Sequence, residues 1–188
     1  AGYQHSRPAR LVRTDAATYG TPDGPAPTRT PQPIVEPGPA LLHVLDLPML
    51  TSGEIAGVPR FAAYAEPWVR VAVYRSPATT GYVLDQLIVN RSTIGKTMQP
   101  FGAGPVARWD RANVLEVRLP STQSLSSLED ILVFAGGNVC AVQNPAGEWE
   151  ILQFASADLV GTDTYRLSRL LRGQFGTEGA MANPLPAG

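Results

Sequence analysis

Short segments of strand type, separated by glycine and proline, follow one another through most of this 188-residue chain. The clearest begins at Val69, where valines alternate with Arg70, Ala72 and Tyr74 in the two-residue period of a sheet. Roughly nine or ten such segments follow residue 40, at the spacing typical of an all-β sandwich or barrel. Long helical periodicity is absent, so we expect an all-β fold, mainly antiparallel, with little helix.

Three local signals refine this expectation. Residues 121–132 are the best helix candidate, because Ser126 or Ser127 could cap a short turn there. Gly136-Gly137 predicts a hairpin or bulge in the next segment. The arginine-rich stretch from Tyr165 to Arg172 predicts a strand that ends in a glycine turn.

The beginning of the chain has a different character. Seven prolines fall within residues 18–39, and proline fixes φ and lacks a donor N–H. We therefore expect an extended Pro-rich N-terminal arm or linker over residues 1–39 and a β-rich segment over residues 40–188. The arm could be a plain linker or could cross a neighbouring subunit. Neither end resembles a natural terminus, so we expect a fragment of a longer chain.

Composition argues against several classes of function. A net charge of −1 gives no overall attraction for nucleic acid or an acidic membrane, and no apolar run reaches the length of a membrane-spanning helix. Cys140 is the only cysteine, and its small apolar neighbours predict a buried, inert thiol. His5 and His43 are the only histidines, and His43 lies inside an apolar run. We expect no enzyme activity, no catalytic, cofactor-binding or metal-binding residue, and no cofactor.

Polar and aromatic side chains leave a few positions for contacts with ligands or subunits. Trp109 lies in a glycine-rich stretch and could stack on a sugar or pack in the interior. The arginines of residues 166–172 could contact nucleic acid or form salt bridges between subunits, although a spacing of three does not line one strand face. Glu148 and Glu150 are expected on a solvated face. The candidate contact residues are Trp109, Asp110, Asn113, Arg166, Arg169 and Arg172.

A series of motifs occurs in a fixed order along the chain. The longest is Y-x-L-x-x-LLRG-x-x-GTE, which begins at Tyr165, and G-x-WE-x-x-QF precedes it at Gly147–Phe154. Four shorter motifs lie upstream, at Leu45–Pro48, Trp68–Ser76, Ile94-Gly95 and Gly104–Arg111. In order and spacing, residues 40–188 resemble tail-tip proteins of gene transfer agents and related siphophage-like particles, a family often described as host-specificity proteins.

The resemblance implies a structural role. A hub of this family is a threefold assembly that closes the tail tube and opens to let DNA through. The implied location is the distal tail end of a virion or phage-like particle, assembled in the bacterial cytoplasm. The implied partners are other copies of the chain in a homotrimer, other tail-tip or baseplate proteins, a host surface glycan, and DNA only in transit, without stable membrane insertion. The family's glycosidase-like TIM barrel has no counterpart here, because its strand–helix alternation is missing.

Two other functions remain as alternatives. A carbohydrate-binding module would present exposed tryptophans with carboxylates and amides on one concave face, and Trp109 with Asp110 and Asn113 is the first place to look. An enzyme acting on cell-wall glycan would need two carboxyl groups across a cleft.

Overall fold

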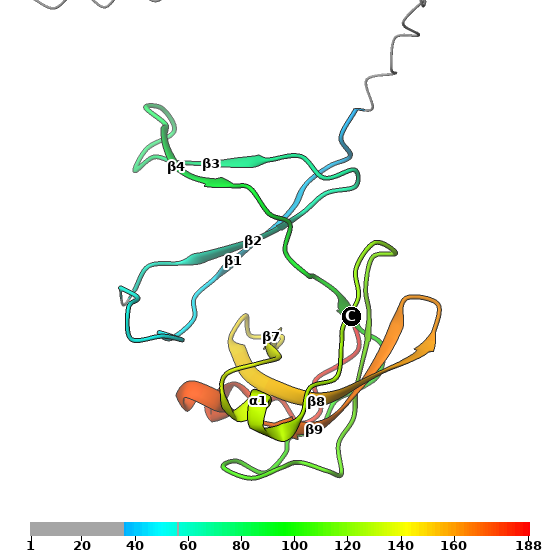
Figure 1. Ribbon diagram of the computed structural model, residues 1–188. Helices are drawn as coiled ribbons and strands as arrows, with labels where there is room; N and C mark the ends of the chain where they lie inside the picture. The colour runs from blue at the N-terminus through cyan, green and yellow to red at the C-terminus, as the bar shows by residue number, and fades with distance from the viewer. Residues whose placement is uncertain (1–35, 56) are drawn as a thin grey trace, which may run out of the picture. The chain divides into compact units, whose positions relative to one another are not determined.

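The computed structural model describes residues 36–55 and 57–188 (Figure 1). The expected arm over residues 1–39 therefore lies almost wholly outside the described residues. The described part contains nine strands in three antiparallel sheets and one short α-helix. The expectation of a mainly antiparallel all-β fold with little helix is confirmed.

Two of the sheets are isolated two-stranded ribbons. In the first, β1 (Leu41–Leu45) pairs with β2 (Arg60–Tyr64). In the second, β3 (Val71–Arg75) pairs with β4 (Val83–Ile88), and the register shifts between Val73 and Tyr74, where Asp85 of β4 has no partner in the ladder. We refer to these two sheets as the ribbons. Pro67 lies between β2 and β3, where its lack of an N–H donor costs no ladder hydrogen bond.

The third sheet has five strands in the order β5-β6-β9-β8-β7. Their bounds are Lys96–Thr97 for β5, Leu115–Arg118 for β6, Val139–Gln143 for β7, Trp149–Gly161 for β8 and Thr164–Leu171 for β9. The long β8–β9 hairpin forms its centre (Figure 1). In β6 the side chains differ in burial along the strand, because Leu115 is buried whereas Arg118 is exposed.

The first half of β8 is buried on both faces, which makes it the core of the five-stranded sheet. Its residues from Glu150 to Ala155 are all buried. One face packs in a cluster of Phe101, Leu115, Leu152, Phe154, Leu167, Leu170 and Leu185. On the other face Ala155 and Leu171 pack against Val133 of the helix. Burial on both faces explains why apolar side chains occur on both faces of this strand.

The helix α1 (Asp130–Phe134) lies at the end of the predicted helical region. The predicted caps are wrong: Glu129 is the N-cap, and neither Ser126 nor Ser127 bonds the helix. The Ser127 hydroxyl instead accepts a hydrogen bond of 2.9 Å from the N–H of Ala157, on β8. The observed helix therefore overlaps the predicted region only over Asp130–Leu132 and extends beyond it to Phe134.

The predicted strand of residues 165–172 is confirmed as β9, which ends within one residue of the predicted bound. Gly173 follows Arg172 with φ +56, the left-handed conformation that glycine tolerates without strain. Two 3₁₀ turns come next, η2 (Gln174–Gly176) and η3 (Glu178–Ala180). Within the described ranges, none of the helices is sufficiently long and apolar to cross a membrane.

Candidate functional site

The best-connected polar group in the described residues is the guanidinium of Arg172, at the end of β9. Its side chain is 1% exposed. Nε donates to Oε1 of Glu150 over 2.6 Å, and Nη2 donates to Oε2 over 2.8 Å, a bidentate pair. Nη1 donates to the Gly102 carbonyl over 2.9 Å and lies 3.5 Å from Oδ2 of Asp110. The guanidinium carbon lies 3.9 Å from the centre of the Phe101 ring. We call Arg172, Glu150 and Asp110 the Arg172 cluster.

Asp110 fastens a loop to the sheet. Its backbone N–H donates to the Leu170 carbonyl over 2.8 Å, and its carbonyl accepts from the N–H of Leu170 over 3.0 Å. Its Oδ1 accepts from the N–H groups of Ala112 and Asn113, and its Oδ2 accepts from the Asn113 side chain over 2.7 Å. Burial alone would raise the pKa of Asp110, but these hydrogen bonds and the charge of Arg172 hold it below its ordinary value of 3.8.

Acid should weaken the cluster through Asp110. Because the folded-state pKa of Asp110 is lowered, its stabilising contribution is complete above its unfolded pKa and is lost as the pH falls through the folded pKa. We expect the difference in unfolding free energy between wild type and Asp110→Asn to be constant near neutrality and to shrink below about pH 4. Urea unfolding at a series of pH values measures it. A difference that stays unchanged down to about pH 2 would contradict this assignment.

The structure corrects the expected solvated face at the start of β8. Glu148 is exposed, but Glu150 is buried and bonds Arg172. The burial of Glu150 is indicated by the mainly apolar residues that follow it, because a carboxylate within a buried strand requires a partner. A single arginine after two buried leucines, at Leu170 and Leu171, is the matching signal on β9.

Trp109 is held between two side chains. Its ring centre lies 5.4 Å from that of Phe134, on α1, and the Arg169 guanidinium carbon lies 5.5 Å from the Trp109 ring. Arg169 also forms an ion pair with Asp130, the first residue of α1. Trp109 is half-buried, so packing accounts for much of its surface.

The three arginines of β9 and its end have different partners and do not line one strand face. Arg166 forms a bidentate contact with Oε1 of Glu116, at 3.1 Å from Nε and 2.8 Å from Nη2, and is half exposed. Asp110 and Arg172 are buried and bond within the chain, and Asn113 donates to Asp110. That Trp109, Arg166 and Arg169 contact a ligand or another subunit stays a prediction.

The remaining reactive side chains have structural surroundings. Burial, and then the charge of Glu150, raise the pKa of Cys140 to about 12, so the thiol stays protonated at neutral pH. His43 meets the Trp149 ring edge-on, with 6.3 Å between ring centres. His5 lies outside the described residues. Within the described part, no three histidine, cysteine or acidic side chains are grouped closely enough to hold a metal ion.

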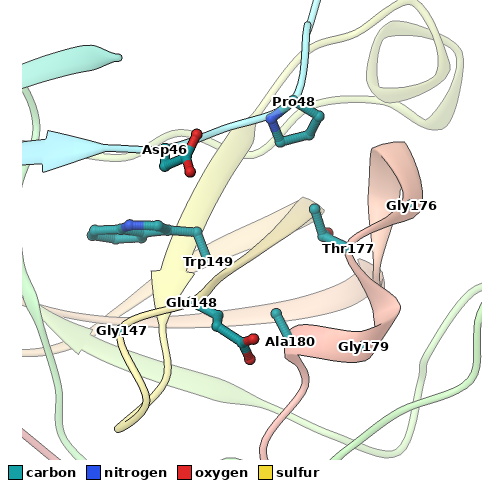
Figure 2. A pocket seen from close by; sticks show the side chains of 9 residues that line it. All are labelled: Asp46, Pro48, Gly147, Glu148, Trp149, Gly176, Thr177, Gly179 and Ala180. Atoms are coloured by element: carbon teal, nitrogen blue, oxygen red, sulfur yellow. The ribbon is translucent and has the colours of Figure 1, made fainter. Parts of the chain in front are cut away.

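A pocket of about 390 Å³ adjoins the start of β8. Figure 2 shows the side chains that surround it, from the end of β1, the β7–β8 turn, β8 and the turns after β9. Its lining residues are Asp46, Pro48, Gly147, Glu148, Trp149, Gly176, Thr177, Gly179 and Ala180. We call this hollow the Trp149 pocket. Sequence reasoning selected Trp109 instead, because Trp149 and Asp46 are brought together only by the fold.

The five-stranded sheet and the ion cluster buried in it define an antiparallel β-domain. Residues 92–188 match the family model described as Rcc01698-like, C-terminal, and the chain belongs to this family, which is associated with the gene transfer agent of Rhodobacter capsulatus. No curated protein matches the chain. The association with gene transfer agents is thus confirmed over residues 92–188, which contain four of the six motifs, and the assignment to a tail-tip protein stays a prediction.

Proposed function

We propose that this chain is a structural part of the distal tail end of a phage-like particle. In this role it contributes to the tail-tip or baseplate hub, to tail closure and host-cell attachment, and to DNA delivery. The partners would be other copies of the chain, in a homotrimer, together with other tail-tip or baseplate proteins. DNA would pass through in transit. Membership of a gene-transfer-agent-associated family supports the choice of particle.

The observation that carries a structural role is the uncovered apolar surface of the ribbons. Thirteen of the twenty-two exposed large hydrophobic side chains in the described residues lie between residues 41 and 89. Only three of the fifteen buried hydrophobic residues lie there: Ala63, Ala65 and Ile88. An isolated two-stranded sheet is marginal in water, and its open edges invite further strand pairing. The ribbons therefore need a partner surface.

The charges of the ribbons favour another copy of the chain as this partner. Most of them are paired internally, by Arg60–Glu54, Arg75–Asp85 and Arg91–Glu66. An apolar surface with neutralised charges does not select an oppositely charged partner, and most soluble oligomers are formed by identical chains. Self-association through the ribbons is the simplest way to cover this surface.

Immunogold electron microscopy tests the location. An antibody against residues 40–188 is applied to particles from the source culture. The proposal expects gold at the distal tail end. Tailed particles without gold at that end, under conditions where a known tail protein is labelled, would refute it.

Self-association is tested separately on the purified 188-residue chain. We expect light scattering to give the mass of three copies, and Leu87→Glu to shift the chain to the mass of one. Leu87 lies in β4 and is 47% exposed, so the charge should prevent association without disturbing the monomer. The matched control is Leu159→Glu, on the β8–β9 hairpin, where the side chain is 64% exposed. A monomeric wild type, or equal dissociation by both variants, would contradict the ribbon interface.

One observation favours the second candidate function, a carbohydrate-binding module that recognises the host surface. The Trp149 pocket places a half-buried tryptophan beside two carboxylates, which is part of the combination that such a module presents. It does so at Trp149 rather than at Trp109. Absence of enzyme activity stays a prediction.

A further inference from the structure

We propose that the Trp149 pocket binds a neutral sugar residue, with the sugar's C–H face on the indole ring and its hydroxyl groups donating to Asp46 and Glu148. The inference deepens the second candidate function and rests on it for the biological source of the glycan. It does not depend on where the chain lies in a particle.

The rim of the pocket is kept low by glycine. Gly147 has φ +89 and Gly176 has φ +78, conformations that L side chains rarely adopt. No heavy atom lies within 4 Å of a Cβ built on Gly176 or Gly179, so the space above them is open. Backbone groups on this side are consequently within reach of a ligand. A volume of about 390 Å³ falls in the range of small-molecule pockets.

Neighbouring residues hold part of the polar lining in place. Oε2 of Glu148 accepts a hydrogen bond of 3.0 Å from the Asn144 side chain, which leaves its other oxygen available. The Thr177 hydroxyl donates to the Gln174 carbonyl over 2.7 Å and accepts from the N–H of Ile151 over 2.9 Å. These bonds fix the turn after β9 against β8. A preorganised lining reduces the entropy lost when a ligand binds.

The charge of the lining determines which sugars fit. Asp46 and Glu148 are its only ionisable groups among the described residues, and none of the lining residues is basic. Phosphate groups and acidic sugars would be repelled. Neutral sugars offer hydroxyl donors for carboxylate acceptors and an apolar face for the indole. A small cation would satisfy the carboxylates but would leave much of the pocket and its glycine rim unused.

The test is saturation-transfer NMR and calorimetry on the purified 188-residue chain. The probes are neutral oligosaccharides of glucose, galactose and N-acetylglucosamine, and spermidine serves as a cation. We expect saturable binding of at least one neutral probe, weakened about tenfold or more by Trp149→Ala, since loss of one aromatic stacking contact has an effect of this size. Asp46→Asn, nearly isosteric, should weaken it severalfold. Trp68→Phe, outside the pocket, should leave it unchanged.

Several results would overturn the proposal. These are no saturable binding of any neutral probe, equal affinity in wild type and both pocket variants, or salt-sensitive binding of spermidine alone. If the chain released reducing ends from a probe, the pocket would be a catalytic site and not a binding subsite. If the immunogold label lies at the tail tip but no neutral sugar binds, this inference is rejected and the proposed role in the particle still holds.

Discussion

Arg172→Met is expected to destabilise the fold by about 3–5 kcal/mol, as removal of one partner from a buried ion pair does. The substitution keeps a long apolar stem but leaves the Glu150 carboxylate without the two donors that bond it at 2.6 and 2.8 Å. It also removes the cation beside Asp110 and the donor to the Gly102 carbonyl. Urea unfolding of the purified chain at neutral pH, followed by tryptophan fluorescence, measures the loss.

Arg166→Met is the matched control, because it removes an arginine from the same strand. Its ion pair with Glu116 is half exposed on the arginine side, and exposed pairs contribute about 0–1 kcal/mol. Adding Glu150→Gln to Arg172→Met should recover part of the loss, since it removes one stranded charge. Similar losses for Arg172→Met and Arg166→Met would show that the buried cluster does not hold the sheet together.

The strands could be predicted because their signals are local. The alternation of valines from Val69 and the Leu115–Arg118 pattern express a face that packs and a face that meets solvent. Pro67 and Gly173 lie where strands end, and the reason is in their covalent structure. Proline has a fixed φ, and glycine tolerates the positive φ found at Gly173. None of these inferences requires knowledge of a distant residue.

The helix α1 was misassigned in part because its signals conflict. Its five residues, DILVF, are mostly apolar and β-compatible, and too short to show a helical period. A distant residue supports the helix: the Gln153 side chain donates to the carbonyl of Val133 over 2.6 Å and to that of Gly137 over 2.8 Å. A contact across twenty residues leaves no trace in local sequence.

The Arg172 cluster cannot be predicted from local sequence for the same reason, although each of its members lies in a motif. Arg172 lies in the LLRG motif, Glu150 in G-x-WE, and Asp110 in the motif that begins at Gly104. The fold brings these three motifs together at one buried guanidinium. Three of the motifs therefore contribute the residues that build a single polar core.

Gly104→Ala should be the second most damaging single change, with an expected loss of about 3 kcal/mol, the upper part of the usual range for overpacking. A methyl group at this position would overlap Oδ2 of Asp110 and lie 2.9 Å from Nη1 of Arg172. Both atoms belong to buried, hydrogen-bonded side chains that cannot move aside without breaking their bonds. The expected loss appears in urea unfolding as a lower midpoint with an unchanged slope.

Gly179→Ala separates this steric effect from the general effect of replacing glycine. No heavy atom lies within 4 Å of a Cβ built there, so the substitution should be neutral or slightly stabilising through the unfolded chain. If Gly104→Ala changed the stability as little as Gly179→Ala, the Arg172 cluster would have space for a methyl group. The packing around Gly104 could then not explain its place in the motif. A large loss for Gly104→Ala alone would show that the motif glycine is needed because the buried guanidinium and carboxylate occupy the space of a side chain.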